Sequence, residues 1–68
     1  MTDSEELKNK ISGSGISITF IADKLGMSRG SLYNKINNNT EFVLSEVKAL
    51  REILRLSEED VEHIFFGN

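Results

Sequence analysis

Apolar residues recur at intervals of three and four along most of this 68-residue chain, which contains no proline. Such spacing gathers apolar side chains on one face of an α-helix, whereas a half-buried strand alternates every second residue. A chain of this length buries only about 60% of the surface that its unfolded form exposes, so it has room for one small core. We therefore expect an all-α fold of short packed helices, with residues 1–68 forming a single domain.

The pattern predicts five helices. They are expected over about residues 4–12, 18–25, 29–37 and 45–54, with a short fifth helix after Ser57. The expected N-caps are residue types that bind the N–H groups of a first helical turn, namely Asp3, Ser17, Ser28 and Ser57. The segment Gly13-Ser14-Gly15 is expected to stop the first helix, and Gly26 to end the second in a left-handed conformation.

The third and fourth helices are joined by a run of asparagines. Asn37 to Thr40 is expected to form a turn, because asparagine tolerates left-handed backbone and bonds to its own neighbours. After the turn, Phe42 and Leu44 are predicted to anchor the chain in the core. Within the third helix we expect Leu32 and Ile36 to face inward, and the spacing leaves two positions open for Tyr33, the core or the surface.

The charges are unevenly distributed. The chain carries 8 basic and 11 acidic residues, a net charge of −3, which by itself argues against binding to nucleic acid. Between Lys24 and Thr40, however, there are basic residues and no acid, whereas residues 52–68 are strongly acidic. The middle of the chain is thus basic and the end acidic.

Residues 18–37, ITFIADKLGMSRGSLYNKIN, read as a helix, a three-residue turn containing glycine and a capped helix, which is the pattern of a helix-turn-helix. This segment resembles the helix-turn-helix of the Cro/repressor (Xre-type) family of phage and bacterial transcription regulators. The matching positions are Ala22, Gly26 and Ser28 together with the apolar Ile21, Leu25, Met27 and Leu32. The following EFVLSEVKALREILRLSEEDVEHIFF is similar to the fourth and fifth helices of small regulators of this kind.

The resemblance implies a lambda-repressor-like DNA-binding domain with a recognition helix at about Arg29 to Asn37 in the major groove. The residues that would then contact bases are Arg29, Gly30, Ser31, Tyr33 and Asn34. The residues that would contact the DNA backbone are Ser17, Ser28, Lys35, Asn38 and Asn39. Two positions depart from the family pattern: Ile18 stands where glutamine is frequent, and Lys35 where an apolar residue is expected, with Ile36 one place later.

The resemblance also implies a homodimer on a palindromic site. The apolar side chains that could form a dimer seam lie at the end of the chain, and they are Val61, Ile64, Phe65 and Phe66. One or both phenylalanines could instead close the core of the monomer.

Other classes of function find little support in the sequence. His63 is the only histidine and there is no cysteine, so no metal site is expected. The acids between Glu58 and Glu62 fit the first turn of a helix, and we expect no catalytic residues, no cofactor and no small-molecule ligand. No apolar run approaches a membrane span, and MTDSEELKNK is unlike a signal peptide, so a cytoplasmic protein is expected. The resemblance implies that the cell is a bacterial host.

Two hypotheses follow. The first is a sequence-specific DNA-binding transcription regulator, similar to phage Cro or repressor proteins. The alternative is a protein-interaction module on the same fold, such as a phage adaptor or an antitoxin, whose acidic surface binds its partner.

Overall fold

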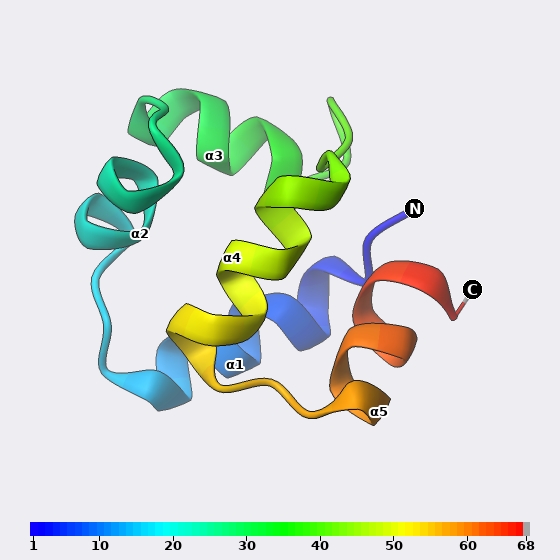
Figure 1. Cartoon of the computed structure of the whole chain (residues 1–68). Helices are drawn as coiled ribbons and strands as arrows, with labels where there is room; N and C mark the ends of the chain where they lie inside the picture. The colour runs from blue at the N-terminus through cyan, green and yellow to red at the C-terminus, as the bar shows by residue number, and fades with distance from the viewer. Residues whose placement is uncertain (68) are drawn as a thin grey trace.

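Short helices make up the ordered elements of the chain. The computed structural model describes residues 1–67, and Figure 1 shows its helices. In chain order they are α1 (Ser4–Ser14), α2 (Ile18–Leu25), α3 (Arg29–Ile36), α4 (Leu44–Leu54) and α5 (Glu58–Val61). The last one continues directly into a π-helical turn, η1 (Glu62–Phe66). The predicted all-α fold of five short helices is therefore confirmed.

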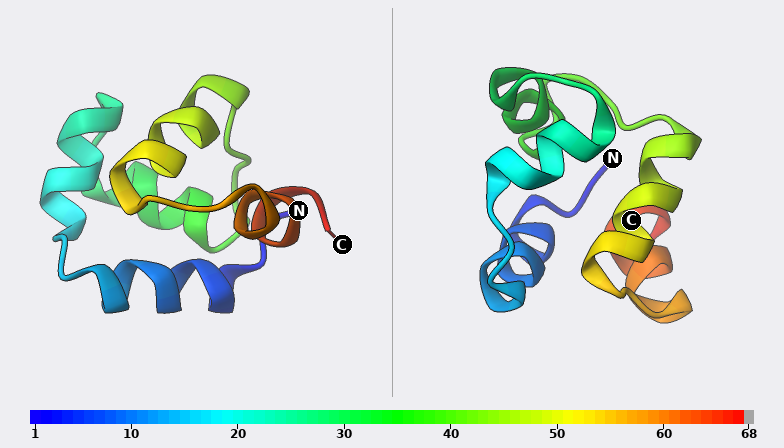
Figure 2. Two further views of the ribbon diagram at one scale, coloured as in Figure 1. Left: turned by 60° about the horizontal axis from the view of Figure 1, so that its bottom comes forward. Right: turned by 60° about the vertical axis from the view of Figure 1, so that its left-hand side comes forward.

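The helices surround one core. In Figure 1, α1 lies along the bottom, α3 along the top and α4 crosses in front of them, with α2 and α5 at opposite sides. Figure 2 shows α1 as a separate lower layer, and the first residues of the chain lie beside η1. Every element except α5 contributes fully or nearly fully buried apolar side chains to this core. They are Leu7, Ile11, Ile21, Ala22, Leu32, Ile36, Val47, Leu50, Leu56, Ile64 and Phe65.

The helix starts follow the predicted caps. The side chains of Asp3, Ser17, Ser28 and Ser57 each accept the N–H of the residue three places later. Helix α4 begins one residue earlier than predicted. Its first turn is closed by the Glu46 carboxylate, which accepts the backbone N–H of residue 43 at 3.0 Å.

Some local details differ from the prediction. Helix α1 runs to Ser14, two residues beyond its predicted end, and Gly15 of the predicted stop segment ends it with a φ of 74°. Leu44 is not a core anchor, because 63% of its surface is exposed. Tyr33 is 48% exposed and so lies outside the core. The buried Ile36 occupies the inward position at the end of α3, as the shifted spacing predicted.

The first residues of the chain hold the end of α3. Asn38 has a left-handed backbone, with a φ of 67°, as predicted for the asparagine turn. Its side chain forms a pair of 2.8 Å hydrogen bonds with Thr2: the Thr2 N–H donates to Asn38 Oδ1, and Asn38 Nδ2 donates to the Thr2 carbonyl. Asn38 Nδ2 also donates to Ser4 Oγ at 3.1 Å, while that hydroxyl donates to the Ile36 carbonyl. We call this set of bonds the N-terminal clamp.

The same segment is also bonded to η1. The backbone N–H of Asp3 donates to the Ile64 carbonyl at 2.7 Å. The Asp3 carboxylate lies 3.3 Å from Nε2 of His63. Residues 2–4 therefore join two elements that lie far apart in the sequence, the end of α3 and the end of the chain.

The clamp can be tested with Asn38→Gly. Glycine keeps the left-handed backbone without strain, so the substitution removes only the side-chain bonds. We expect the free energy of unfolding to fall by about 1–3 kcal/mol, measured by urea denaturation. The matched control is Asn37→Gly at the neighbouring exposed residue, which has an ordinary φ of −91°. Equal losses in the two variants would show that the clamp contributes nothing.

Asp60 links α5 to α1. Its carboxylate accepts the backbone N–H of Ser57 at 3.0 Å and lies 3.3 Å from the ammonium of Lys10. The bond from the Ser57 backbone, assisted by the Lys10 charge, holds the pKa of Asp60 below its usual value of 3.8. The ionised form of Asp60 is therefore the form that stabilises the fold.

Asp60→Asn is accordingly expected to destabilise the protein in a pH-dependent way. A carboxylate whose pKa is lower when folded contributes stability above its unfolded pKa and loses it as the pH falls through the folded pKa. The melting temperature of the variant should lie below that of the parent at pH 7. The difference should begin to shrink as the pH falls below about 4 and should vanish below the lowered pKa of Asp60. Glu58→Gln removes one charge from the same turn and serves as the control. A difference that persists at low pH would contradict the proposed role of the ionised group.

Candidate nucleic-acid interface

Helices α2 and α3 are packed together through a tight turn. Gly26 has a φ of 70°, as predicted, and Met27 donates its N–H back to the Ala22 carbonyl at 3.0 Å. Ala22 is almost fully buried, and the small side chain lets the two helices approach closely. Leu32 is fully buried on the inner side of α3. This packing leaves the opposite side of α3 uncovered.

The uncovered side of α3 carries the residues predicted to contact bases. All five are exposed, namely Arg29, Gly30, Ser31, Tyr33 and Asn34. The Ser28 hydroxyl accepts the Ser31 N–H at 3.1 Å, so one N–H of the first turn is bound internally. The other N–H groups at a helix start have no partner within the helix and attract anions. The start of α3 therefore presents donors from both its backbone and the Arg29 side chain.

A shallow hollow runs between the starts of α2 and α3. It is lined by Ser17, Thr19, Phe20, Ala22, Asp23, Met27 and Arg29. It thus brings together two residues predicted to contact different parts of DNA, Ser17 for the backbone and Arg29 for a base. Asp23 places one negative charge in the same hollow, which opposes the approach of phosphate.

Phe20 is a feature of this surface that the sequence interpretation missed. The residue is 47% exposed, and the ammonium of Lys24 lies 5.4 Å from the ring centroid, in range for a cation–π contact. Phe20 and Asp23 are three residues apart, on the side of α2 opposite the buried Ile21. From this spacing, both residues could have been assigned to the surface on the basis of the sequence.

Lys35 is less available than its predicted role requires. Its ammonium donates to the Glu41 carbonyl at 2.9 Å and lies 3.2 Å from the Glu46 carboxylate. The side chain is largely covered, and its charge is balanced by Glu46. Lys35 therefore joins α3 to the start of α4 instead of extending toward solvent.

The asparagines after α3 differ in their surroundings. Asn38 belongs to the N-terminal clamp, which uses its side-chain donor and acceptor. Asn39 is exposed, and its Nδ2 donates to Oδ1 of Asn34 at 3.3 Å. Both asparagines were predicted to contact the DNA backbone. Of the two, only Asn39 is exposed, and it lies beside Asn34.

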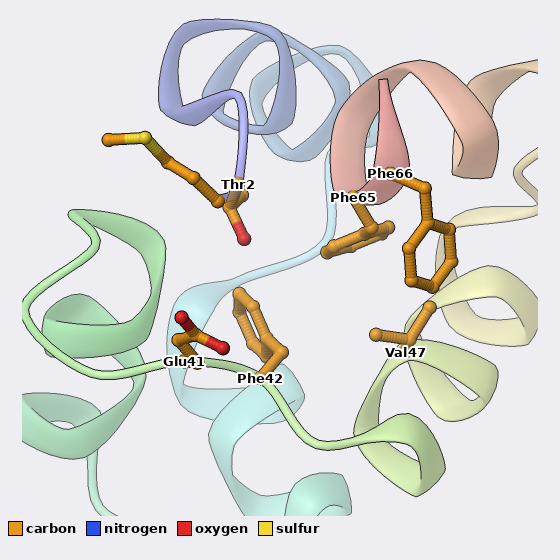
Figure 3. A pocket seen from close by; sticks show the side chains of 7 residues that line it. Thr2, Glu41, Phe42, Val47, Phe65 and Phe66 are labelled. Carbon is orange, nitrogen blue, oxygen red and sulfur yellow. The ribbon is translucent and has the colours of Figure 1, made fainter. Parts of the chain in front are cut away.

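The predicted dimer seam is divided between core and surface. Ile64 and Phe65 are buried, and the ring of Phe65 meets Phe42 edge to face, with centroids 5.6 Å apart and planes at 86°. Figure 3 shows Phe65 turned toward Phe42, whereas Phe66 lies beside Val47. Val61 is half-buried, and Phe66 is 62% exposed. The burial of Ile64 and Phe65 removes those two side chains from any seam in this conformation.

Within residues 1–67, no group of three histidine, aspartate or glutamate side chains is placed to hold a metal ion. None of the helices over this range combines the length and the apolar character needed to cross a bilayer.

Comparison with known proteins gives no match. No family model, no curated protein and no solved structure matches this chain. Function is therefore inferred from the side chains of α2, α3 and the turn between them.

Gly30 allows a test of this surface that does not require DNA. A Cβ atom added there would lie in open space, with Ser28 Oγ the nearest atom at 3.9 Å. Because Gly30 sits in a helix with an ordinary backbone, Gly30→Ala should raise the free energy of unfolding by about 0.5–1 kcal/mol. Gly26→Ala is the control and should destabilise, because its φ of 70° strains any side chain. A destabilised Gly30→Ala protein would mean that the start of α3 is not helical in solution.

Proposed function

We propose that the protein is a sequence-specific DNA-binding transcription regulator, similar to Cro and repressor proteins, with α3 in the major groove. One observation supports this most directly. Arg29 is exposed at the start of a helix that follows another helix across a short glycine turn, within a stretch of chain from Lys24 to Thr40 that contains no acid. In a helix-turn-helix the first residues of the second helix reach base edges.

The side chains at this position have the chemistry for reading bases. The guanidinium of Arg29 can donate two hydrogen bonds to O6 and N7 of guanine, and the amide of Asn34 can pair with N6 and N7 of adenine. Asn34 is oriented by its contact with Asn39. Ser17 and Ser28 lie at the starts of α2 and α3, where phosphate oxygens are favoured.

The electrostatic attraction of one copy for DNA is modest. Lys24 and Arg29 supply positive charge near the start of α3, but Lys35 is balanced by Glu46, and Asp23 lies close by. A regulator of this kind gains affinity when two copies occupy a site with two-fold symmetry. We therefore propose a homodimer acting on a palindromic operator in the cytoplasm of a bacterium, encoded by a phage, a prophage or the bacterium itself.

A second candidate is a protein-interaction module on the same fold, such as a phage adaptor or an antitoxin. The net charge of −3 and the exposed ring of Phe20 favour it. Salt dependence separates the two functions, because binding to DNA releases counterions and weakens steeply as salt is added.

The first experiment is selection from a pool of random DNA duplexes at low ionic strength. The DNA-binding proposal expects enrichment of a sequence with two-fold symmetry and a logarithm of affinity that falls linearly with the logarithm of salt concentration. Failure to enrich any sequence, together with no salt-dependent binding at low ionic strength, would reject the proposal and leave the interaction module.

Arg29→Ala then tests the residue-level assignment. We expect binding to the selected duplex to weaken about tenfold to a hundredfold, with relaxed preference at one guanine position, as measured by fluorescence anisotropy on a set of single-base variants. Lys8→Ala removes an exposed positive charge from α1, on the far side of the fold, and should change affinity little. Unchanged base preference in Arg29→Ala would exclude Arg29 as the base-reading residue.

A further inference from the structure

Gly30 has no reason within the described chain to be a glycine. Only Gly15 and Gly26 among the described glycines have a positive φ, so the helical backbone at position 30 is one that any residue adopts. A Cβ atom there would meet nothing within 4 Å except Ser28 Oγ, at an ordinary contact distance of 3.9 Å. A glycine inside a helix destabilises it relative to alanine. The packing of the described chain therefore gains nothing from the missing side chain.

The missing side chain leaves a gap on the outer face of α3. With about 3.6 residues per turn, Gly30 and Asn34 fall roughly opposite the buried Leu32. Tyr33 and Asn34 are the neighbours of Gly30 on the helix surface, one turn further along, and Arg29 precedes it. All three of these side chains are exposed. We call the bare backbone of Gly30 between them the Gly30 site.

Polar side chains suited to base edges lie on either side of the Gly30 site. Arg29 carries a guanidinium, and Asn34 carries an amide whose Oδ1 accepts a hydrogen bond from Nδ2 of Asn39 at 3.3 Å. These side chains extend beyond the helix backbone, so a flat partner that contacts both of them leaves the Gly30 site empty unless it carries a projecting group. Glycine is the usual residue where a backbone and a ligand approach closely. The Gly30 site therefore fits a partner with a small projecting group.

We propose that the Gly30 site receives the C5-methyl group of a thymine in the major groove. This methyl is the one apolar group among the groups that distinguish the four bases there, and the others are hydrogen-bond donors and acceptors. The Cα of a glycine offers an apolar contact and no side-chain hydrogen bond, so it complements a methyl group better than an amino or carbonyl group. The inference rests on the proposed function and deepens it, because it names a base beside those assigned to Arg29 and Asn34.

Contact distances set the effect of adding a side chain at this position. Apolar carbon atoms approach one another to about 3.5–4.0 Å. A Cβ atom at position 30 would project from the outer face of α3 into the space of the thymine methyl, and the base edge would be pushed away from Arg29 and Asn34. Gly30→Ala should therefore weaken binding to DNA although it is expected to stabilise the free protein. A substitution that stabilises the protein cannot reduce its affinity by unfolding it.

The test uses the duplex enriched by selection and a series in which deoxyuridine replaces one thymine at a time, at the same position of both half-sites. Deoxyuridine lacks the C5-methyl group and keeps O4 and the base pairing. Fluorescence anisotropy should show that the parent loses affinity at one position, by about threefold to fivefold for each half-site, as expected for one buried methyl group. Gly30→Ala should bind the thymine duplex about tenfold or more weakly than the parent. It should regain most of this loss with deoxyuridine at that same position.

Gly13→Ala is the matched control. Gly13 lies in α1 without a positive φ, and a Cβ atom there would meet nothing within 4 Å. Figure 1 shows α1 at the bottom of the molecule and α3 at the top. The control should therefore stabilise the protein as Gly30→Ala does and leave the affinity for every duplex unchanged. Melting temperatures of the two variants check that both remain folded.

Two results would overturn the Gly30 site alone. One is a Gly30→Ala protein that binds the selected duplex as tightly as the parent. The other is a loss of binding that deoxyuridine relieves at no position. In either case the DNA-binding function stands, because the parent binds its duplex. A parent that enriches no duplex rejects both the function and the Gly30 site.

Discussion

Burial of six side chains at the centre of the molecule holds together the four longer helices and η1. Leu7, Ile21, Leu32, Ile36, Leu50 and Ile64 are fully or almost fully buried, and they come from α1 to α4 and η1. The longest helices have 11 residues, and helices of this length are marginal in water when isolated. The helices are therefore stable only together, and the exposed face of α3 keeps its shape because the other face is held in this core.

The helix starts could be predicted from the sequence because their causes are local. A serine or aspartate binds the N–H group three residues later wherever the chain begins to coil, as Ser17 and Ser28 do. The positions of Leu44 and Tyr33 could not be predicted in this way. An apolar or aromatic side chain is buried only if another element covers it. The residues near Leu44 do not indicate that no other element covers this side chain.

The candidate site was predictable to a similar extent. The helical spacing that buries Leu32 also leaves Arg29 and Asn34 exposed, so these residues could be assigned to a surface from the sequence. The pairing of Lys35 with Glu46 depends on how the chain returns after the asparagine turn, and this return is a tertiary feature. The two phenylalanines at the end of the chain are separated for the same reason, because the Phe42 ring covers only one of them.

The N-terminal clamp has a consequence for the motions of the molecule. Chain ends usually fray independently of the rest of a domain. Here the segment that begins the chain is bonded to Asn38 after α3 and to the Ile64 carbonyl in η1. Fraying of residues 2–4 would break the bonds at both places, so the end of α3 and η1 would lose these contacts together. The first residues of the chain thus connect the helix that carries the candidate surface to the last helical turn of the described chain.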